Sequence, residues 1–174
     1  MSYIYINTQT WTAGPTPSVY SSSAMCAYSY YRSYVLLFSG SSIAYYNDAD
    51  GGAGGGSWTT DASLTLSSSR TLGFAVTFYD AAWPNFENVY IIAGYSPAQS
   101  VIDVMDTVAW DITFYTALNT ARFDLHAIVD DVGRIWVFGG NTDTIEVSES
   151  IYDSLGGLGN FTGVFAFVLY VQVH

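Results

Sequence analysis

The chain has 174 residues, of which 50% are apolar and 17% are aromatic, and this composition excludes an intrinsically disordered protein because it can supply a hydrophobic core. It carries 15 acidic residues against four arginines and no lysine, and its net charge of −11 argues against binding to nucleic acid or to anionic lipid. The longest apolar stretch, at 164–171, is shorter than the roughly 20 residues of a membrane-spanning helix, so we expect no membrane insertion.

The N-terminal part, residues 1–22, predicts two strands. The first covers 3–7, where aromatic and β-branched residues alternate along the run, and the second begins at Trp11. Both resemble the last two strands of the four-stranded modules that follow. We therefore expect residues 1–22 to form half of such a module, without its first two strands.

A four-stranded module then recurs three times, at 23–69, 70–121 and 122–174. Its fourth strand opens with Trp, or with Phe in the last module, at positions 11, 58, 110 and 161, which are 47, 52 and 51 residues apart. The residues twelve positions after the tryptophans are Ser23, Arg70 and Arg122. The first and second strands are expected at 24–30 and 34–40, at 74–78 and 89–94, and at 127–129 and 135–140. The third strands are expected to end at 46–47, 105–106 and 152–153.

The third module resembles a kelch repeat. It has an arginine, a hydrophobic strand that ends in two glycines, and a Tyr-Asp pair: Arg122, 135–140 and 152–153. Membership of that family implies a β-propeller with one blade per repeat. The earlier modules depart from the pattern at Ser23, at the single Gly40 and at Gly94-Tyr95. We expect one all-β domain over 1–174, a propeller-like array of four-stranded antiparallel blades.

About three and a half modules leave the array incomplete. A propeller avoids exposed sheet edges by closing its ring, and unpaired edges promote association. Either the chain closes a small ring, with 165–173 paired to 3–6, or another chain completes it. The tyrosines of the first module bear on this choice, because those not used between blades would form an exposed patch for a neighbouring subunit: Tyr28, Tyr30, Tyr31, Tyr34, Tyr45 and Tyr46.

Two sets of loops are candidates for binding. In an up-and-down blade, the insertion 80–88 lies on one face of the array, where its aromatic residues could anchor a partner. On the other face, the connections between the second and third strands carry a tyrosine and polar residues that suit a hydroxyl-rich glycan. The candidate residues are Trp83, Asn85 and Phe86 on the first face, and Tyr95, Asn141 and Asp143 on the second. Ordinary packing and turn chemistry are the competing interpretations of both sets.

The catalytic inventory is small. His126 and His174 share no ligand spacing with Cys26, which predicts no zinc site, and 47–51 is a poor match to a calcium loop. No nucleophile elbow or phosphate-binding loop is present, so we expect no cofactor.

The sequence thus predicts a non-enzymatic structural or interaction protein of a larger assembly, through self-association or other protein partners. Residues 1–6 lack a signal-peptide pattern, so we expect a soluble protein. A virion or extracellular surface fits the lysine-free composition. A glycan-binding module is the alternative, and a glycosidase or an oxidase is less favoured because only three Glu and two His are available.

Overall fold

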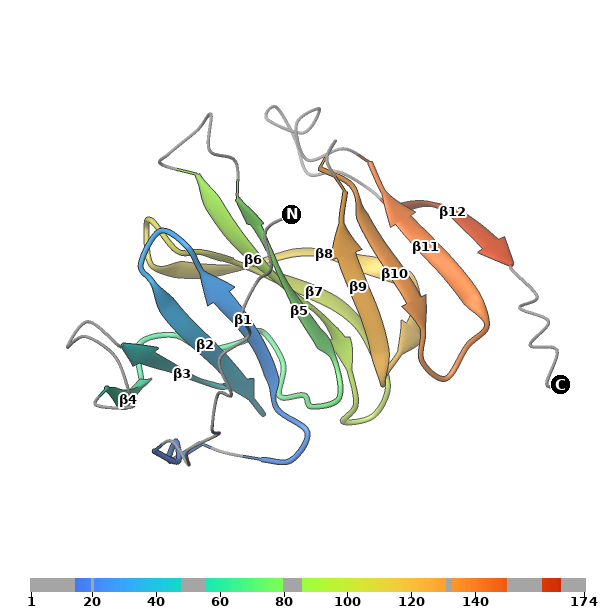
Figure 1. Cartoon of the computed structure of the whole chain (residues 1–174). Helices are drawn as coiled ribbons and strands as arrows, with labels where there is room; N and C mark the ends of the chain where they lie inside the picture. Colours follow the sequence, from blue (N-terminus) through green and yellow to red (C-terminus); the bar gives the residue numbers. More distant parts are fainter. Residues whose placement is uncertain are drawn as a thin grey trace, which may run out of the picture.

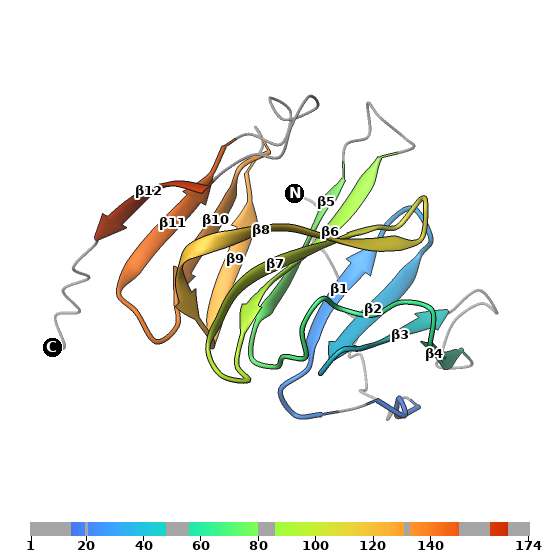
Figure 2. The ribbon, with the colours of Figure 1, turned by 180° about the vertical axis from the view of Figure 1, so that it is seen from behind.

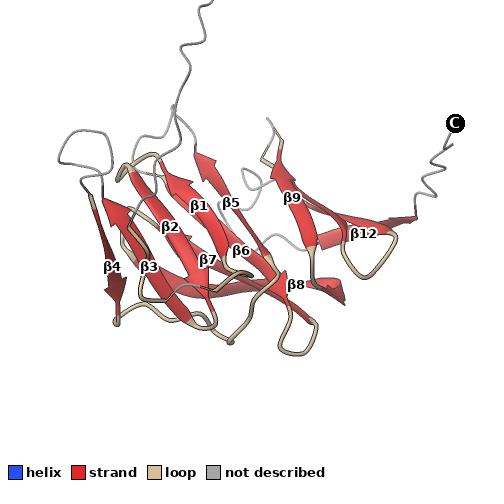
Figure 3. Cartoon of the chain, turned by 60° about the horizontal axis from the view of Figure 1, so that its bottom comes forward, coloured by secondary structure: helices blue, strands red, loops and turns tan. Residues whose placement is uncertain are grey.

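The computed structural model describes residues 15–19, 21–47, 56–79, 86–130, 133–149 and 161–166. Its twelve elements are all strands, arranged in three four-stranded antiparallel sheets (Figures 1 and 3). This confirms the prediction of an all-β chain with four-stranded antiparallel units. The predicted strands at 3–7 and Trp11 and the Tyr-Asp pair at 152–153 lie outside the described residues.

Each sheet is built from four consecutive strands, which follow one another in the sheet as they do in the chain. The first sheet contains β1 (Met25–Ser29), β2 (Tyr34–Ser39), β3 (Ser42–Asn47) and β4 (Ser57–Asp61). The second contains β5 (Phe74–Tyr79), β6 (Glu87–Gly94), β7 (Gln99–Asp106) and β8 (Asp111–Arg122). The third contains β9 (Leu125–Val129), β10 (Ile135–Gly139), β11 (Thr144–Ser148) and β12 (Phe161–Ala166).

The three sheets stack face to face in a row, with β1 against β5 and β5 against β9 (Figure 2). One buried cluster joins the first two sheets: Met25, Leu36, Phe38 and Ile43 with Ala75, Val89, Ile91 and Met105. A second joins the last two: Tyr90, Ile92 and Ile102 with Leu125, Ala127, Ile135 and Val137. Because side chains alternate along a strand, each sheet has two faces. We call the face that points along the row from the first sheet to the third the forward face, and the opposite face the rear face.

The strand registers define which residues of the three sheets are equivalent. Met25 pairs with Phe38, Phe74 with Ile92, and His126 with Phe138. The second and third sheets place Arg70 and Arg122 four residues before this pair. In the first sheet that position is Ser21, two residues before the Ser23 indicated by the spacing from tryptophan.

Glycine at the end of the second strand is required by a close backbone approach. Gly94 has φ 130°, and a Cβ there would lie 2.7 Å from the carbonyl oxygen of Thr71. Gly140 has φ 90°, and its Cβ would lie 2.5 Å from the carbonyl oxygen of Phe123. The connection that enters each sheet therefore crosses directly over these glycines, which explains why the sequence repeats them.

Candidate interaction surface

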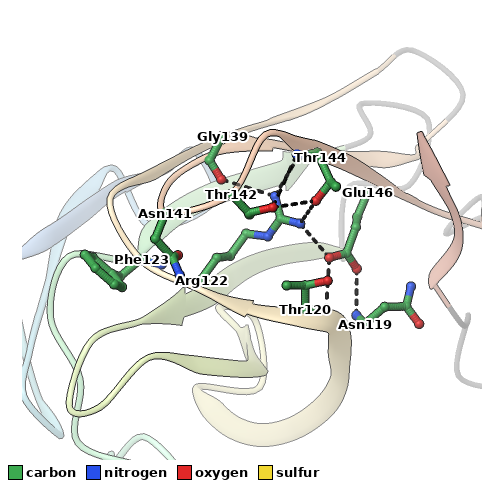
Figure 4. A network of polar contacts seen from close by, with 9 residues as sticks. All are labelled: Asn119, Thr120, Arg122, Phe123, Gly139, Asn141, Thr142, Thr144 and Glu146. Atoms are coloured by element: carbon green, nitrogen blue, oxygen red, sulfur yellow. Dashed lines mark hydrogen bonds and ion pairs between the residues drawn. The ribbon is translucent and has the colours of Figure 1, made fainter. Parts of the chain in front are cut away.

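Two buried ion pairs hold the connections that enter the second and third sheets. Nη2 of Arg70 lies 2.8 Å from Oδ2 of Asp103, and Nη2 of Arg122 lies 2.7 Å from Oε1 of Glu146, with all four side chains fully buried. Arg122 also donates to the carbonyl oxygens of Gly139 and Thr144 (Figure 4). These repeat arginines are therefore structural. Arg70 joins the connection before β5 to β6 and β7, whereas Arg122, the last residue of β8, joins the second sheet to β10 and β11 of the third.

Both carboxylates of these pairs also accept hydrogen bonds from backbone amides. Ser67 donates to Asp103 at 3.0 Å, and Asn119 and Thr120 donate to Glu146 at 2.6 and 3.1 Å (Figure 4). These hydrogen bonds tie the backbone around each pair to a buried carboxylate and so order it.

A third buried carboxylate, Glu87, fixes the turn between β1 and β2 across the boundary between the first two sheets. It accepts hydrogen bonds from the hydroxyl of Ser29 at 2.6 Å and from the backbone amides of Tyr30 and Tyr31 at 2.7 and 3.0 Å. The hydroxyl of Thr107 donates to the same carboxylate at 2.7 Å. The turn is thus attached to the start of β6 by a charged acceptor, and hydrogen bonds to a charged acceptor are stronger than neutral ones.

Arg32 attaches the same turn from its other side. Its Nε donates to the carbonyl oxygen of Thr107 and its Nη2 to that of Val108, and its guanidinium lies 4.5 Å from the ring centroid of Trp110. The indole of Trp110 in turn donates to Asp61 at 2.9 Å, from the second sheet to the first. The hydrogen bonds from Ser63 and from this indole lower the pKa of Asp61.

The turn, together with β1 and the end of β5, presents tyrosines that remain exposed, and we call this set the tyrosine surface: Tyr28, Tyr30, Tyr31 and Tyr79. Tyr30 is 60% exposed although its ring meets two others, Tyr28 edge-on at 5.1 Å and Tyr79 stacked at 5.6 Å. Thr77 donates to the carbonyl oxygen of Tyr28 at 2.6 Å. The rings therefore stand on a backbone that is fixed in place, as is typical of aromatic anchors at protein interfaces.

The other tyrosines of the first module are used internally. Tyr34 and Tyr45 stack at 4.9 Å, and both pack edge-on against Trp110. Tyr46 packs beside Trp58 at 5.5 Å. The sequence could not assign the roles of Tyr34 and Tyr45 because both depend on Trp110, which the second sheet provides.

The loop residues predicted to anchor a partner are only partly placed by the structure. Trp83 and Asn85 lie outside the described residues. Phe86 is half-buried, packs against the core and meets the ring of Phe78 edge-on at 6.0 Å. Phe86 therefore contributes to the core between the second and third sheets instead of standing free on a loop.

Two of the three residues predicted for a glycan, Tyr95 and Asn141, meet at Phe123. Tyr95 is exposed and its ring contacts that of Phe123 at 4.9 Å, while Oδ1 of Asn141 accepts a hydrogen bond from the Phe123 amide at 3.0 Å. Asp143 is exposed two residues further on. The two connections thus lie on one side of the molecule, at the ends of the strands opposite to the β1–β2 turn (Figure 1).

A further polar group fixes a tryptophan on the third sheet. Asp130 Oδ2 accepts hydrogen bonds from the indole of Trp136 and from Nε of Arg134, each at 2.8 Å. Partial burial acts to raise the pKa of Asp130, but the hydrogen bonds and the charge of Arg134 outweigh it and lower the pKa to about 2. The Arg134 guanidinium also lies 5.4 Å from the ring centroid of Trp136.

Within the described ranges, no three His, Cys, Asp or Glu side chains are grouped to hold a metal ion. The part of the chain that the structure describes contains no helix long and apolar enough to cross a membrane. No protein-family model matches the chain, and the comparison with curated proteins finds no match either.

Proposed function

We propose that this chain is a non-enzymatic structural or interaction protein that contributes a propeller-like set of sheets to a larger assembly, such as a virion or a cell surface. The observation that carries the proposal is the tyrosine surface. Tyr30 and Tyr31 stand on a turn fixed by Glu87 and Arg32, and the exposed rings of Tyr28 on β1 and Tyr79 on β5 contact Tyr30. Exposed aromatic groups of this kind are rare on a monomer that has no partner, and rigid tyrosines bind at low entropic cost.

The propeller is part of the proposal. It is supported by the order of the sheets, by the inner row of β1, β5 and β9, and by the equivalent registers of the three sheets. The kelch-like arginine and glycine of the third module fit the same architecture, since both lie where the chain enters the third sheet. Arg122 donates to Glu146 there, and Gly140 leaves room for the carbonyl oxygen of Phe123.

The test is the native mass of the purified protein, measured by light scattering over a wide range of concentration. We expect a defined oligomer that is weakened when Tyr30 and Tyr79 are both replaced by Ser. The control is Tyr95→Ser, which removes an exposed ring from the opposite side of the molecule. A strict monomer at the highest concentration would refute the proposal.

Glycan binding is the second candidate, and the meeting of Tyr95 and Asn141 at Phe123 favours it. An exposed aromatic ring beside amide and carboxylate groups could stack on a sugar and bond its hydroxyls. Binding on a glycan array that is lost in Tyr95→Ala would support this candidate. Binding that survives both Tyr95→Ala and Asn141→Ala would contradict it.

A further inference from the structure

The forward face of the third sheet is largely apolar, and its one ring contact with another described sheet is that of His126 with Phe74 of β5 at 5.6 Å. Its residues are identified by the cross-strand pairs of Trp136 with Ile128 and Val147, and of Phe138 with His126 and Ile145. Ile128 is 54% exposed, and the two aromatic side chains are only half-buried. We call these six residues the third forward face.

The equivalent positions of the other two sheets are buried. In the first sheet they include Leu36, Phe38 and Ile43, which are 0% exposed, and in the second Tyr90, Ile92 and Ile102, which are at most 1% exposed. In both cases the rear face of the following sheet covers them. The third forward face therefore has the composition of an internal contact surface and the exposure of an external one.

The β1 and β2 part of the rear face of the first sheet is the complementary surface; at β4 the same face is bonded by the chain itself, through Pro15 to Trp58 and Ser18 to Thr60. The cross-strand pairs of Cys26 with Leu37 and Tyr28 with Val35 place these four residues on it. Cys26, Tyr28 and Val35 are exposed, and none of the four is charged. In the second and third sheets the equivalents of Cys26 are Ala75 and Ala127, and both are buried beneath the preceding sheet.

We propose that a second copy of this chain packs the rear face of its first sheet against the third forward face, repeating the contact that already joins the sheets within one chain. The same contact made in both directions would relate two copies by a two-fold axis and close a ring of six sheets. Rings of about four to eight blades are typical of propellers. This inference rests on the proposed function and names the partner.

Trp136 is the expected anchor of that contact. Asp130 and Arg134 fix its indole through the hydrogen bond at 2.8 Å and the guanidinium at 5.4 Å, and Phe138 stacks beside it with rings 12° from parallel. A large side chain whose rotamer is fixed before binding loses little entropy in a complex, and tryptophan is enriched among binding hot spots.

Charge predicts how this contact responds to salt. The four named residues of the rear face are uncharged, but each copy carries a net charge of −11, so two copies repel one another outside the contact. Salt screens this long-range repulsion and leaves apolar burial intact. Association should therefore strengthen as sodium chloride is raised, whereas a contact made by surface ion pairs would weaken.

The test uses Cys26, the only cysteine of the chain. Within the chain, Ala27 of the first sheet packs against the buried cluster that contains Ala75 of the second. Ala75 is the equivalent of Cys26, and Ala27 is the equivalent of Ile128. Cys26 of one copy should therefore face position 128 of the other. We expect Ile128→Cys to yield a covalent dimer under mild oxidation or with a short bifunctional thiol reagent, and to yield none when Cys26→Ser is added.

The matched control is Phe114→Cys, at a site on β8 that is 57% exposed and belongs to neither surface. Equal cross-linking of this control would overturn the inference, as would a dimer that persists in the Cys26→Ser background. A bridge within a single chain would also overturn it, because the two faces would then meet in a monomer.

A second measurement is independent of cysteine chemistry. Ile128→Glu and Val35→Glu should each lower the native mass, since each places a charge in one of the two surfaces. Mixed together, they should form a dimer through the one contact that neither variant has lost. If the wild-type chain is an oligomer but this complementation fails, the head-to-tail contact is wrong and the assembly role stands; a monomeric wild-type chain refutes both.

Discussion

The guanidinium of Arg70 lies 2.8 Å from the carboxylate of Asp103 in the buried centre of the second sheet, and the first sheet lacks both partners. In the first sheet, Ser21 stands at the position of Arg70 and Ala44 at the position of Asp103. Ala44 pairs with Leu37 in the same way that Asp103 pairs with Ile91. An arginine without its acid would leave a charge buried and unpaired, which is costly. The first sheet therefore lacks the arginine and the acid together, and no charge is left buried without its partner at this position.

This relationship predicts how the pair responds to substitution. Asp103→Ala alone should lower the free energy of unfolding by about 3–5 kcal/mol, because it leaves Arg70 uncompensated. The double variant Asp103→Ala with Arg70→Met should recover most of that loss. Within the described residues, Nε of Arg70 and Oδ1 of Asp103 have no hydrogen-bond partner, so the native pair is not fully satisfied. Urea denaturation of the wild type, the two single variants Asp103→Ala and Arg70→Met, and the double variant gives the coupling energy, and additive losses would contradict the argument.

Gly94→Ala should lower the stability of the fold more than Gly40→Ala, although the two glycines occupy equivalent positions. At Gly94 the new Cβ would lie 2.7 Å from a backbone carbonyl, whereas at Gly40 the nearest atom is the hydroxyl of Ser69 at 3.4 Å. Both have positive φ, so alanine carries a conformational cost of about 1 kcal/mol or more at either site. Gly94→Ala should cost clearly more because backbone must also move. Thermal unfolding of the two variants compares them directly, and equal losses would show that the crossing connection shifts freely.

The repeats could be predicted from the sequence because strand alternation, terminal glycines and tryptophan spacing are local signals. The positions of Arg70 and Arg122 were located by the same pattern. The contacts across sheets were not predictable: Glu87 lies in the second module, yet it accepts amide hydrogen bonds from a turn more than fifty residues earlier. Nor could spacing identify Ser21, which lies ten positions after Trp11 in the sequence, whereas Arg70 and Arg122 lie twelve positions after Trp58 and Trp110. Phe86 looked like a loop anchor because its contact with Phe78 depends on tertiary packing.

Glu87→Gln should loosen the tyrosine surface without unfolding the chain. The amide keeps the size of the side chain but removes the charge and one acceptor, while four donors still require acceptors: the hydroxyls of Ser29 and Thr107 and the amides of Tyr30 and Tyr31. Hydrogen bonds to charged groups contribute about 1.5–3 kcal/mol, so the turn should open more often. Hydrogen exchange at the two tyrosine amides should accelerate, whereas exchange in β9 and β10 should not change. Uniform acceleration throughout the chain would mean that Glu87 acts on global stability alone.

The pKa of Asp130 predicts a specific loss of stability in acid. Its folded value of about 2 lies below the usual value of 3.8, so its contribution is fully present above about pH 4 and is lost as the pH falls through 2. Asp130→Asn should therefore lower the melting temperature at pH 7, and the difference from the wild type should shrink between pH 4 and pH 2. Because Arg134 is 45% exposed, solvent screening limits the effect to about 1 kcal/mol, or roughly 2–4 °C in a chain of this size. A difference that stays constant over this range would mean that the carboxylate's charge does not stabilise the turn that holds Trp136.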